Sequence, residues 1–385
     1  METTFQQFPL WSQVEFVADK APARDFRVSL EDIESGTGHL IAGELANYDA
    51  DGIPFEQGDI LFGKLRPYLA KCYHAPQPGT AGGDIHVYRP LPHAHPRFIY
   101  YVVSSGSFVG HASVSTTGVK MPRTDWAALR RFPVPLPPRD TQRAIADYLD
   151  RETSEIDAML DKLDGLGRLL EERRQSEVRD SVAPEGATFT QVKYLAQVSL
   201  GKTVQSKKLG ENDRLTNYVR AANIQPNGLA LDDQKMYMTP DELVKYDIVA
   251  NDVLVVEGGA GYGRSVTVEA DMPGWGFQNH VIRLRPNHEV VGKFLDYTIK
   301  NHLWGGLLNI LSDGATIPAI SSDKARELPV LAVSYVEQER IVQHLDETTA
   351  RIDAMLAKTQ QLKDLLTERR SALITAAVTG QIEVH

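Results

Sequence analysis

Cationic and aromatic side chains beside short apolar runs are the residues of this chain best suited to do chemistry. The clearest group lies in segment 63–71, directly after the strand-like run Asp-Ile-Leu-Phe, and comprises Lys64, Arg66, Tyr68 and Lys71. Lysine and arginine bind phosphate oxygens, and arginine also reads guanine through paired hydrogen bonds. The segment therefore predicts contacts with nucleic acid.

Similar side chains recur in other loops of both halves of the chain. Asparagine reads adenine much as arginine reads guanine, so an amide near the cations extends the same prediction. The further candidates are Lys120, Arg123, Lys202, Lys207, Lys208, Tyr262, Arg264, Asn279 and Lys324. Each of them alone is more often a solvated surface group, and the prediction depends on their recurrence in paired loops.

A nucleotide-hydrolysis site is the first competing interpretation. Segment 196–203 fits a loose phosphate-loop pattern that ends in Lys202 and Thr203. Such a loop needs a helix directly after it, because the helix N-terminus meets the phosphate. The next residues, 204–213, show no helical apolar period, so we disfavour a nucleotidase that uses Lys202 and Thr203.

Cysteine and histidine spacing raises a second alternative, a metal site. Cys72 and His74 are spaced as metal ligands often are, and so are His93 and His95. Neither pair has a second pair that would complete a four-ligand shell. We therefore predict no metal site, and we find no catalytic constellation in the sequence.

Composition limits the kind of protein. The 385 residues carry 41 Lys and Arg against 51 Asp and Glu, a formal net charge of −10, so any cationic surface has to be local. The single cysteine excludes a disulfide within the chain and favours the cytoplasm. No apolar run reaches the length of about eighteen residues that a membrane helix needs. We expect a cytoplasmic protein without a membrane partner.

An internal repeat organises the chain. Residues 142–150 match residues 338–346, and the register continues without a gap through Ile156-Asp-Ala-Met-Leu and Ile352-Asp-Ala-Met-Leu. The chain is therefore two copies of one unit, a variable globular block followed by a similar helical block. The predicted limits are 1–138 and 184–333 for the globular blocks and 139–183 and 334–385 for the helical ones.

The helical blocks show a heptad pattern. The predicted apolar seam comprises Ile145, Leu149, Ile156, Met159, Leu163, Leu166 and Leu170 in the first block and Ile341, Leu345, Ile352, Met355, Leu362 and Leu366 in the second. Each helix should span about 35 residues, or roughly 50 Å. Such a stripe needs a partner, and the other copy in the same chain can supply it. The pattern leaves a parallel or an antiparallel pairing open.

The globular blocks contain short strand-like runs with Gly and Pro between them. Runs 59–62, 85–88 and 98–103 in the first block have counterparts at 252–256, 264–268 and 280–284 in the second. Both blocks therefore read as mixed α+β modules.

Several of these features occur together in one known family. Pro135-Leu-Pro-Pro precedes the first helical block, Leu-Leu-x-Glu-Arg-Arg occurs in both blocks, and the chain ends with Ala372-Leu-Ile-Thr-Ala-Ala-Val-Thr-Gly-Gln. Gly58-Asp-Ile-Leu-Phe-Gly-Lys-Leu-Arg-Pro-Tyr is similar to a stretch common in target-recognition domains. In this arrangement the chain resembles the specificity subunits of type I restriction-modification systems.

The resemblance implies a fold, a function and partners. The expected α+β fold has two mixed target-recognition domains separated by two long helices, which pack as an intramolecular antiparallel coiled coil. The expected function is non-catalytic reading of a bipartite, asymmetric site in double-stranded DNA, with the helices as a ruler. Methylation subunits with S-adenosylmethionine would dock on the helices, and a restriction subunit with ATP and Mg²⁺ could join. This chain itself would hold no cofactor.

A different class of function remains open from the residues alone. The two globular blocks could bind proteins, which would make the chain a non-DNA-binding scaffold with two protein-interaction modules. The absence of any DNA binding at every salt concentration, even with partner subunits present, would favour that alternative.

Overall fold

The chain forms two compact units in a computed structural model that describes residues 5–41, 51–118, 120–312 and 318–384. Unit 1 comprises Met1–Gly165 and Thr359–His385, and unit 2 comprises Leu166–Lys358. Each unit contains one globular block and a segment of each of two long helices, α4 (Arg139–Val182) and α10 (Tyr335–Thr379).

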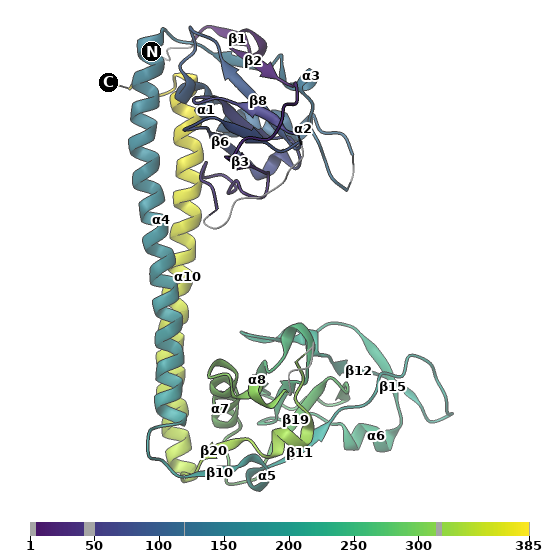
Figure 1. The fold of residues 1–385 in the computed structure, drawn as a ribbon. Coiled ribbons are helices and arrows are strands. Elements are labelled where there is room, and N and C mark those ends of the chain that lie inside the picture. The colour runs from purple at the N-terminus through teal and green to yellow at the C-terminus, as the bar shows by residue number, and fades with distance from the viewer. Residues whose placement is uncertain (1–4, 42–50, 119, 313–317, 385) are drawn as a thin grey trace. The chain divides into compact units, whose positions relative to one another are not determined.

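Unit 1 is built on a four-stranded antiparallel sheet in the order β2-β8-β5-β6. These strands are β2 (Val14–Val17), β5 (Ile60–Gly63), β6 (Cys72–His74) and β8 (Ile85–Pro90). Helix α1 (Pro96–Ser104) packs against β5 and β6, and α2 (Gly106–Val114) follows it (Figure 1). The core between these helices and the sheet includes Phe62, Tyr88, Phe98 and Phe108, which are fully buried.

Smaller elements complete the globular block of unit 1. Strands β3 (Arg27–Val28), β7 (Gly79–Ala81) and β4 (Ile53–Phe55) form a three-stranded sheet, and β1 (Gln7–Pro9) pairs with β9 (Pro133–Pro135). The short helices are η1 (Leu10–Ser12), η2 (Pro67–Leu69) and α3 (Trp126–Leu129).

Unit 2 repeats this plan. Its main antiparallel sheet has the order β11-β19-β16-β17, formed by β11 (Ala196–Leu200), β16 (Val253–Val256), β17 (Ser265–Thr267) and β19 (Val281–Pro286). Helix α7 (Gly292–Trp304) packs against β16 and β17, and α8 (Leu307–Leu311) follows it. The order of strands and helices thus confirms the internal repeat that the sequence predicts.

The remaining elements of unit 2 form its smaller sheets and turns. Strands β15 (Lys235–Met238), β12 (Arg214–Val219) and β18 (Trp275–Phe277) make a three-stranded sheet, while β13 (Ile224–Gln225) pairs with β14 (Gly228–Leu229) and β10 (Phe189–Gln191) with β20 (Pro329–Leu331). The short helices are α5 (Val192–Leu195), η3 (Ala221–Asn223), α6 (Pro240–Lys245), η4 (Gly259–Gly261) and α9 (Ser322–Arg326).

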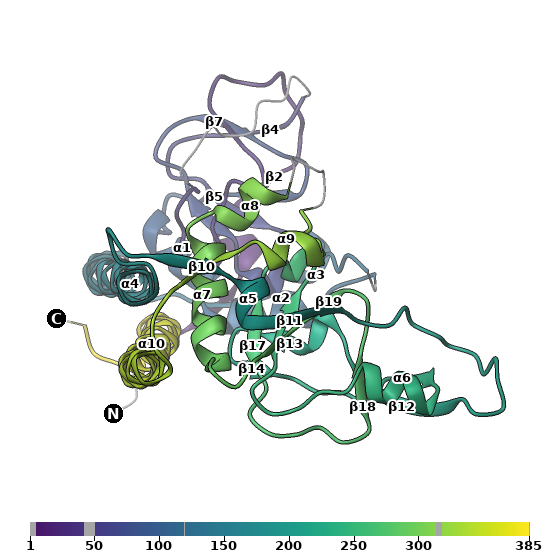
Figure 2. The same ribbon diagram turned by 90° about the horizontal axis from the view of Figure 1, so that it is seen from below.

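The segments of α4 and α10 that belong to one unit lie side by side and run antiparallel (Figures 1 and 2). In unit 1, Asp157 pairs with Arg370, and Asp164, one heptad later, pairs with Lys363, one heptad earlier. The predicted fold class is therefore confirmed. The helices have 44 and 45 residues, so the prediction of about 35 residues was too short.

The helix seam is only partly the predicted one. The leucine and isoleucine row is buried at Ile145, Leu149, Ile156, Leu170, Ile341, Leu345, Ile352 and Leu366, and Leu163 is half-buried. Met159, Leu166, Met355 and Leu362 are 44–52% exposed, so their placement in the seam was wrong.

The error concerns the residues that line the seam beside the leucine and isoleucine row, because they lie on the flank opposite to the predicted one. The row is completed by buried or half-buried residues three positions before some of these leucines and isoleucines, such as Thr153 and Gly167 in α4 and Thr349 in α10. Because several of these residues are small or polar, the apolar pattern pointed to the opposite flank. Met159 and its equivalents lie on the exposed flank of the seam as a result.

Equivalent contacts join each globular block to the start of its own helix. In unit 1, the Gln142 side chain accepts the His95 N–H at 2.8 Å; in unit 2, Gln338 accepts the Val291 N–H at 2.9 Å. These glutamines occupy the same position of the repeat. The attachment of block to helix is therefore a repeated feature and does not depend on the variable loops.

Candidate nucleic-acid interface

Three short backbone segments of unit 1 bring the first group of predicted residues together. Leu65 forms an antiparallel bridge with Arg123, and the Arg66 N–H donates to the Pro122 carbonyl at 2.8 Å. The Lys64 N–H donates to the Asp84 carbonyl at 3.0 Å. The loop after β5 and the loop before α3 thus place Lys64, Arg66 and Arg123 on one surface.

The side chains of this surface are mostly exposed to solvent. Arg66 and Arg123 are exposed, and Tyr68 retains 56% of its accessible area. Arg123 forms an ion pair with Asp84 at 2.6 Å, where both partners are nearly half exposed. Burial, and then repulsion from Arg123, lowers the pKa of Lys64. An excess of positive charge is therefore gathered here in an otherwise acidic chain, as phosphate binding requires.

Two other predicted residues of unit 1 differ in their surroundings. Lys120 is exposed in the loop before α3. Lys71 donates from Nζ to the Leu30 carbonyl at 2.9 Å, so it ties the loop after β5 to a neighbouring segment. This tether has no signal in the sequence, because Leu30 lies 41 residues before Lys71 in the chain.

Several predicted residues of unit 2 are held inside the unit. Tyr262 is 9% exposed and its hydroxyl donates to the Leu308 carbonyl at 2.6 Å, so the expectation of an exposed, DNA-facing tyrosine was wrong. The Lys202 ammonium forms an ion pair with Glu242 and is only 11% exposed. Lys324 donates to the Leu311 carbonyl at 2.5 Å. Their hydrogen bonds serve the packing of unit 2.

The other predicted residues of unit 2 lie in two different settings. Lys207 and Lys208 are exposed in the stretch between β11 and β12, and Asn279 is half-buried beside β19. Arg264 lines a cavity of about 780 Å³, together with α7 residues such as Tyr297. The structure therefore does not gather the unit 2 candidates on one surface as it does Lys64, Arg66 and Arg123.

The competing phosphate-loop interpretation does not match the local fold. Lys202 forms a parallel bridge with Gln278, and no helix follows it before β12 begins at Arg214. A phosphate loop needs a helix N-terminus at that point.

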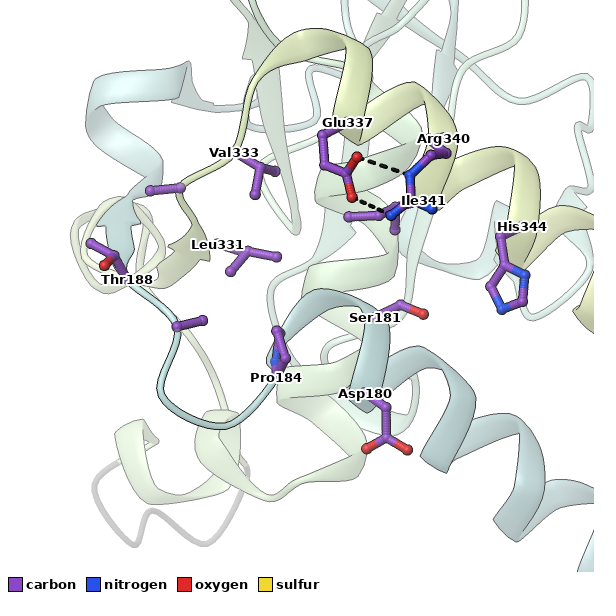
Figure 3. Close-up of a pocket in the computed structure, with 12 residues that line it drawn as sticks. Asp180, Ser181, Pro184, Thr188, Leu331, Val333, Glu337, Arg340, Ile341 and His344 are labelled. Atoms are coloured by element: carbon purple, nitrogen blue, oxygen red, sulfur yellow. Dashed lines mark hydrogen bonds and ion pairs between the residues drawn. The ribbon is translucent and has the colours of Figure 1, made fainter.

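A second hollow lies apart from the predicted nucleic-acid candidates. A hollow of about 620 Å³ in unit 2 lies where α4 ends and α10 begins, and Glu337 and Arg340 on its lining pair at 2.6 Å (Figure 3). None of the predicted nucleic-acid candidates, all of which lie in the described ranges, lines it. Over the same ranges, no group of three or more His, Cys, Asp or Glu could hold a metal ion, and no helix is long and apolar enough to cross a membrane.

Sequence comparisons connect this arrangement to known proteins. Residues 33–165 match the family model of the type I restriction modification DNA specificity domain. The specificity subunit of the type I restriction enzyme StySPI of Salmonella potsdam is 22% identical over 311 residues, which cover 76% of this chain and 67% of that one. The specificity subunit of EcoKI of Escherichia coli K12 is 25% identical over 205 residues, which cover 52% and 44%.

By sequence, the chain is similar to the specificity subunits of type I restriction-modification systems. Solved structures agree with the fold of a specificity subunit over its full length. A chain from a structure of type I restriction-modification complex assembly has a TM-score of 0.78 at 16% identity and covers 99% of both chains. The HsdS subunit from Thermoanaerobacter tengcongensis has a TM-score of 0.55 at 17% identity and covers 99% of this chain and 98% of that one.

Two buried carboxylates of the chain position the loops, and the sequence analysis did not single them out. Asp59 accepts the Glu56 N–H at 2.8 Å and pairs with Arg89; Asp252 pairs with Arg285 at the same place in unit 2. Both aspartates stand just before the strand that leads into the loop. The signal was present in the repeat, where Gly58-Asp-Ile-Leu matches Asn251-Asp-Val-Leu and Arg89-Pro matches Arg285-Pro.

Proposed function

We propose that the chain is the DNA-reading subunit of a type I restriction-modification complex. Each unit would read one half of a bipartite, asymmetric site in double-stranded DNA, and helices α4 and α10 would set the spacing. The observation that carries the proposal is the cationic surface of unit 1, where Lys64, Arg66 and Arg123 come together on two bridged loops. Phosphate contacts position such a surface and base contacts give it specificity.

The length of the helices supports a spacing role. A helix of 44 residues is about 66 Å long at 1.5 Å per residue. Double-stranded DNA rises about 3.4 Å per base pair, so a rod of this kind converts helix length into base pairs. Because α4 contributes residues to both units, one continuous element connects the two readers.

Exposed apolar side chains on the helices support the docking of partner subunits. Six such residues are at least 44% exposed and occupy equivalent positions of the two helices: Met159, Leu166 and Leu169 in α4, and Met355, Leu362 and Leu365 in α10. A continuous apolar stripe that is exposed on a helix often marks a site of contact with another protein. We assign these residues, the exposed apolar stripe of each unit, to the methylation subunits; the stripe comprises Met159, Leu362 and Leu365 in unit 1 and Leu166, Leu169 and Met355 in unit 2.

Catalysis and cofactors belong to the partners in this proposal. The methylation subunits would bind S-adenosylmethionine, and a restriction subunit would use ATP and Mg²⁺; this chain would bind none of them. The complex would act on DNA in the cytoplasm. Calorimetry of the purified chain with S-adenosylmethionine or ATP should give no binding heat, and micromolar binding of either would contradict the assignment.

Mapping of methylated bases tests the proposed function directly. Cells that contain the methylation subunits should methylate a split motif only when this chain is also present. Purified complex should protect the same motif from nuclease digestion, and protection should weaken steeply between about 50 and 200 mM salt. A methylation pattern that does not depend on the chain, or no binding at low salt, would refute the proposal and favour the protein-scaffold alternative.

A further inference from the structure

The loop after β5 contains a turn with unusual backbone angles. Arg66 has φ 50° and ψ 59°, and Ala70 has φ 49°, so both lie in the left-handed region that favours glycine. The turn is closed by the Leu69 N–H, which donates to the Arg66 carbonyl at 2.9 Å. Pro67 follows Arg66 and further restricts its backbone. Arginine therefore occupies a left-handed backbone conformation that glycine would adopt at a lower cost in free energy.

Unit 2 builds the same turn with glycine. There the Tyr262 N–H donates to the Gly259 carbonyl at 3.0 Å, and Gly259 and Gly263 have φ 80° and 72°. Gly259 therefore occupies the place of Arg66, and Gly263 the place of Ala70. The turn itself does not need an arginine, because its repeat forms without one.

The neighbours of this position change in the same way. The Leu65–Arg123 bridge of unit 1 corresponds to the Gly258–Ala319 bridge of unit 2. The residue before each bridge donates its N–H across the loop, Lys64 to Asp84 and Glu257 to His280. Lys64, Arg66 and Arg123 are thus replaced by Glu257, Gly259 and Ala319. The two units share a backbone at this place, but unit 2 has none of these three cations there.

The guanidinium of Arg66 does no structural work that would explain its presence. It is exposed, and among the described residues it has no hydrogen-bond or ion-pair partner. Its backbone, in contrast, is fixed by the N–H bond to Pro122 and by Pro67. Residues kept in strained backbone conformations cluster at functional sites. Arg66 therefore has a guanidinium without a partner among the described residues, on a backbone that a hydrogen bond and a proline hold in place.

We propose that Arg66 is a specificity-determining residue that reads a guanine in the half-site bound by unit 1; this inference rests on the proposed function. Guanine presents two acceptors in the major groove, and an arginine fork matches both. A phosphate contact does not need a fixed base, and Lys64 and Arg123 can supply it nearby without a left-handed backbone. Unit 2 has Gly259 at this place, so its half-site is read by other residues.

Substitutions at the two left-handed positions separate specificity from folding. We would measure R66G, R66K and A70G in the intact complex with methylation subunits, by selection from a randomised DNA library and by thermal melting. R66G should melt no lower than wild type, because glycine relieves the backbone, yet lose about 10- to 100-fold discrimination at one guanine of one half-site. R66K keeps the charge but not the fork and should lose the same discrimination.

The matched control is A70G. It relieves the same kind of backbone strain in the same turn without removing a guanidinium, so it should leave the selected motif unchanged.

Three results would overturn the inference. One is an unchanged motif for R66G. Another is an equal weakening of all sequences with a reduced salt dependence, which would indicate a phosphate contact only. The third is a lower melting temperature for R66G, which would indicate a structural role. A wild-type complex that selects no split motif would instead refute the proposed function itself.

Discussion

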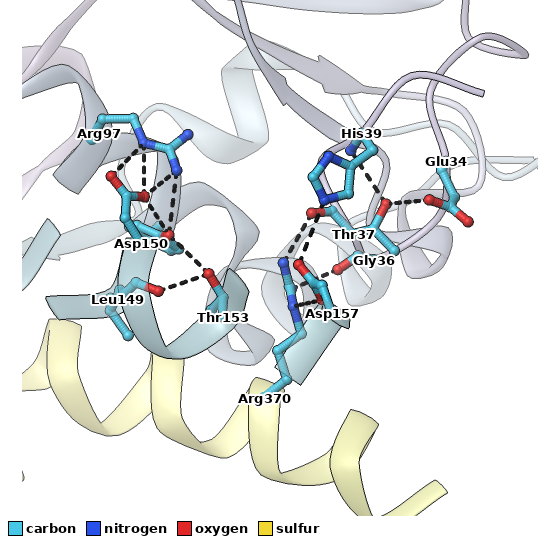
Figure 4. Close-up of polar contacts among 11 residues, drawn as sticks. Glu34, Gly36, Thr37, His39, Arg97, Leu149, Asp150, Thr153, Asp157 and Arg370 are labelled. Atoms are coloured by element: carbon cyan, nitrogen blue, oxygen red, sulfur yellow. Dashed lines mark hydrogen bonds and ion pairs between the residues drawn. The ribbon is translucent and has the colours of Figure 1, made fainter. Parts of the chain in front are cut away.

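Arg370 donates from Nε to Asp157 at 3.0 Å, and the repeat-equivalent pair in unit 2, Arg174 and Asp353, makes the same link between α10 and α4. The two pairs differ in what else they hold. Arg370 also donates to the carbonyls of Gly36 and Thr37 at 2.8 and 2.9 Å (Figure 4). One ion pair of the helix seam therefore also fastens a loop of the globular block, whereas its copy bonds to no loop among the residues that the structure describes.

The difference predicts unequal effects of the same substitution. R370M removes a nearly buried guanidinium and leaves Asp157 and two carbonyls without their donor, so it should destabilise unit 1 by roughly 2–4 kcal/mol. R174M is the matched control: its partner Asp353 is 62% exposed, and we expect a loss below about 1 kcal/mol.

Hydrogen exchange of the intact chain can measure both variants, because it reports the two units separately. Exchange in α1 should speed up in R370M, and exchange in α7 should change little in R174M. Equal losses in the two units would show that the bonds to Gly36 and Thr37 add nothing to the stability of unit 1.

Buried histidines predict how the stability of unit 1 depends on pH. Burial lowers the pKa of His86 to about 3 and that of His74 to about 4, whereas an unfolded histidine titrates near 6.5. Between these values the unfolded state binds more protons than the folded state, so stability falls as the pH falls below about 6.5. At pH 5 each histidine should cost roughly 2 kcal/mol relative to neutral pH.

The variant H86N tests this assignment. It removes the titrating group and keeps a polar side chain beside Tyr88, which hydrogen-bonds His86 at 3.0 Å. Its loss of stability between pH 7.5 and pH 5.0, measured by urea unfolding, should be smaller than that of wild type. An identical loss would assign the pH dependence to other groups.

The sequence predicted the helices well because their information is local and periodic. The repeat and the heptads located α4 and α10 and most of the leucine and isoleucine row. They could not determine which flank completes the seam, because Met159 is apolar while the buried Thr153 is not. Long-range contacts decide that choice, and a single helix pattern does not contain them.

Candidate site residues were predictable by type and less so by environment. Segment 63–71 was found because strand, cations and proline are adjacent in sequence. Tyr262 was misplaced because its partner, the Leu308 carbonyl, lies on a helix more than forty residues away. The left-handed backbone of Arg66 had no sequence signal at all, since arginine is not a residue that usually indicates such a turn.

The exposed apolar stripe predicts a surface for partner subunits. The double variant M159K/M355K should weaken association with methylation subunits at least tenfold, because charge replaces apolar contact area. It should leave the melting temperature of the free chain nearly unchanged, since both methionines are about half exposed. Pull-down and analytical ultracentrifugation of mixed subunits measure the effect.

D161K is the control for this stripe. Asp161 is exposed on the same helix, and at 100° per residue it faces away from Met159. It should leave association intact. Undiminished association of M159K/M355K would move the docking surface elsewhere on the chain.

The length of the helices predicts the spacing of the DNA site. Inserting one heptad into α4 and one at the facing position of α10 preserves the period of the seam and lengthens the pair by about 10 Å. The non-specific gap between the two half-sites should then grow, by up to about three base pairs at 3.4 Å each, while both half-sites keep their sequence. Mapping of methylated motifs before and after the insertion measures the gap.

A single insertion in α4 alone is the control: it breaks the register of pairs such as Asp157 with Arg370 and should reduce methylation at every spacing. A gap that stays the same after the paired insertion would show that the helices do not set the spacing.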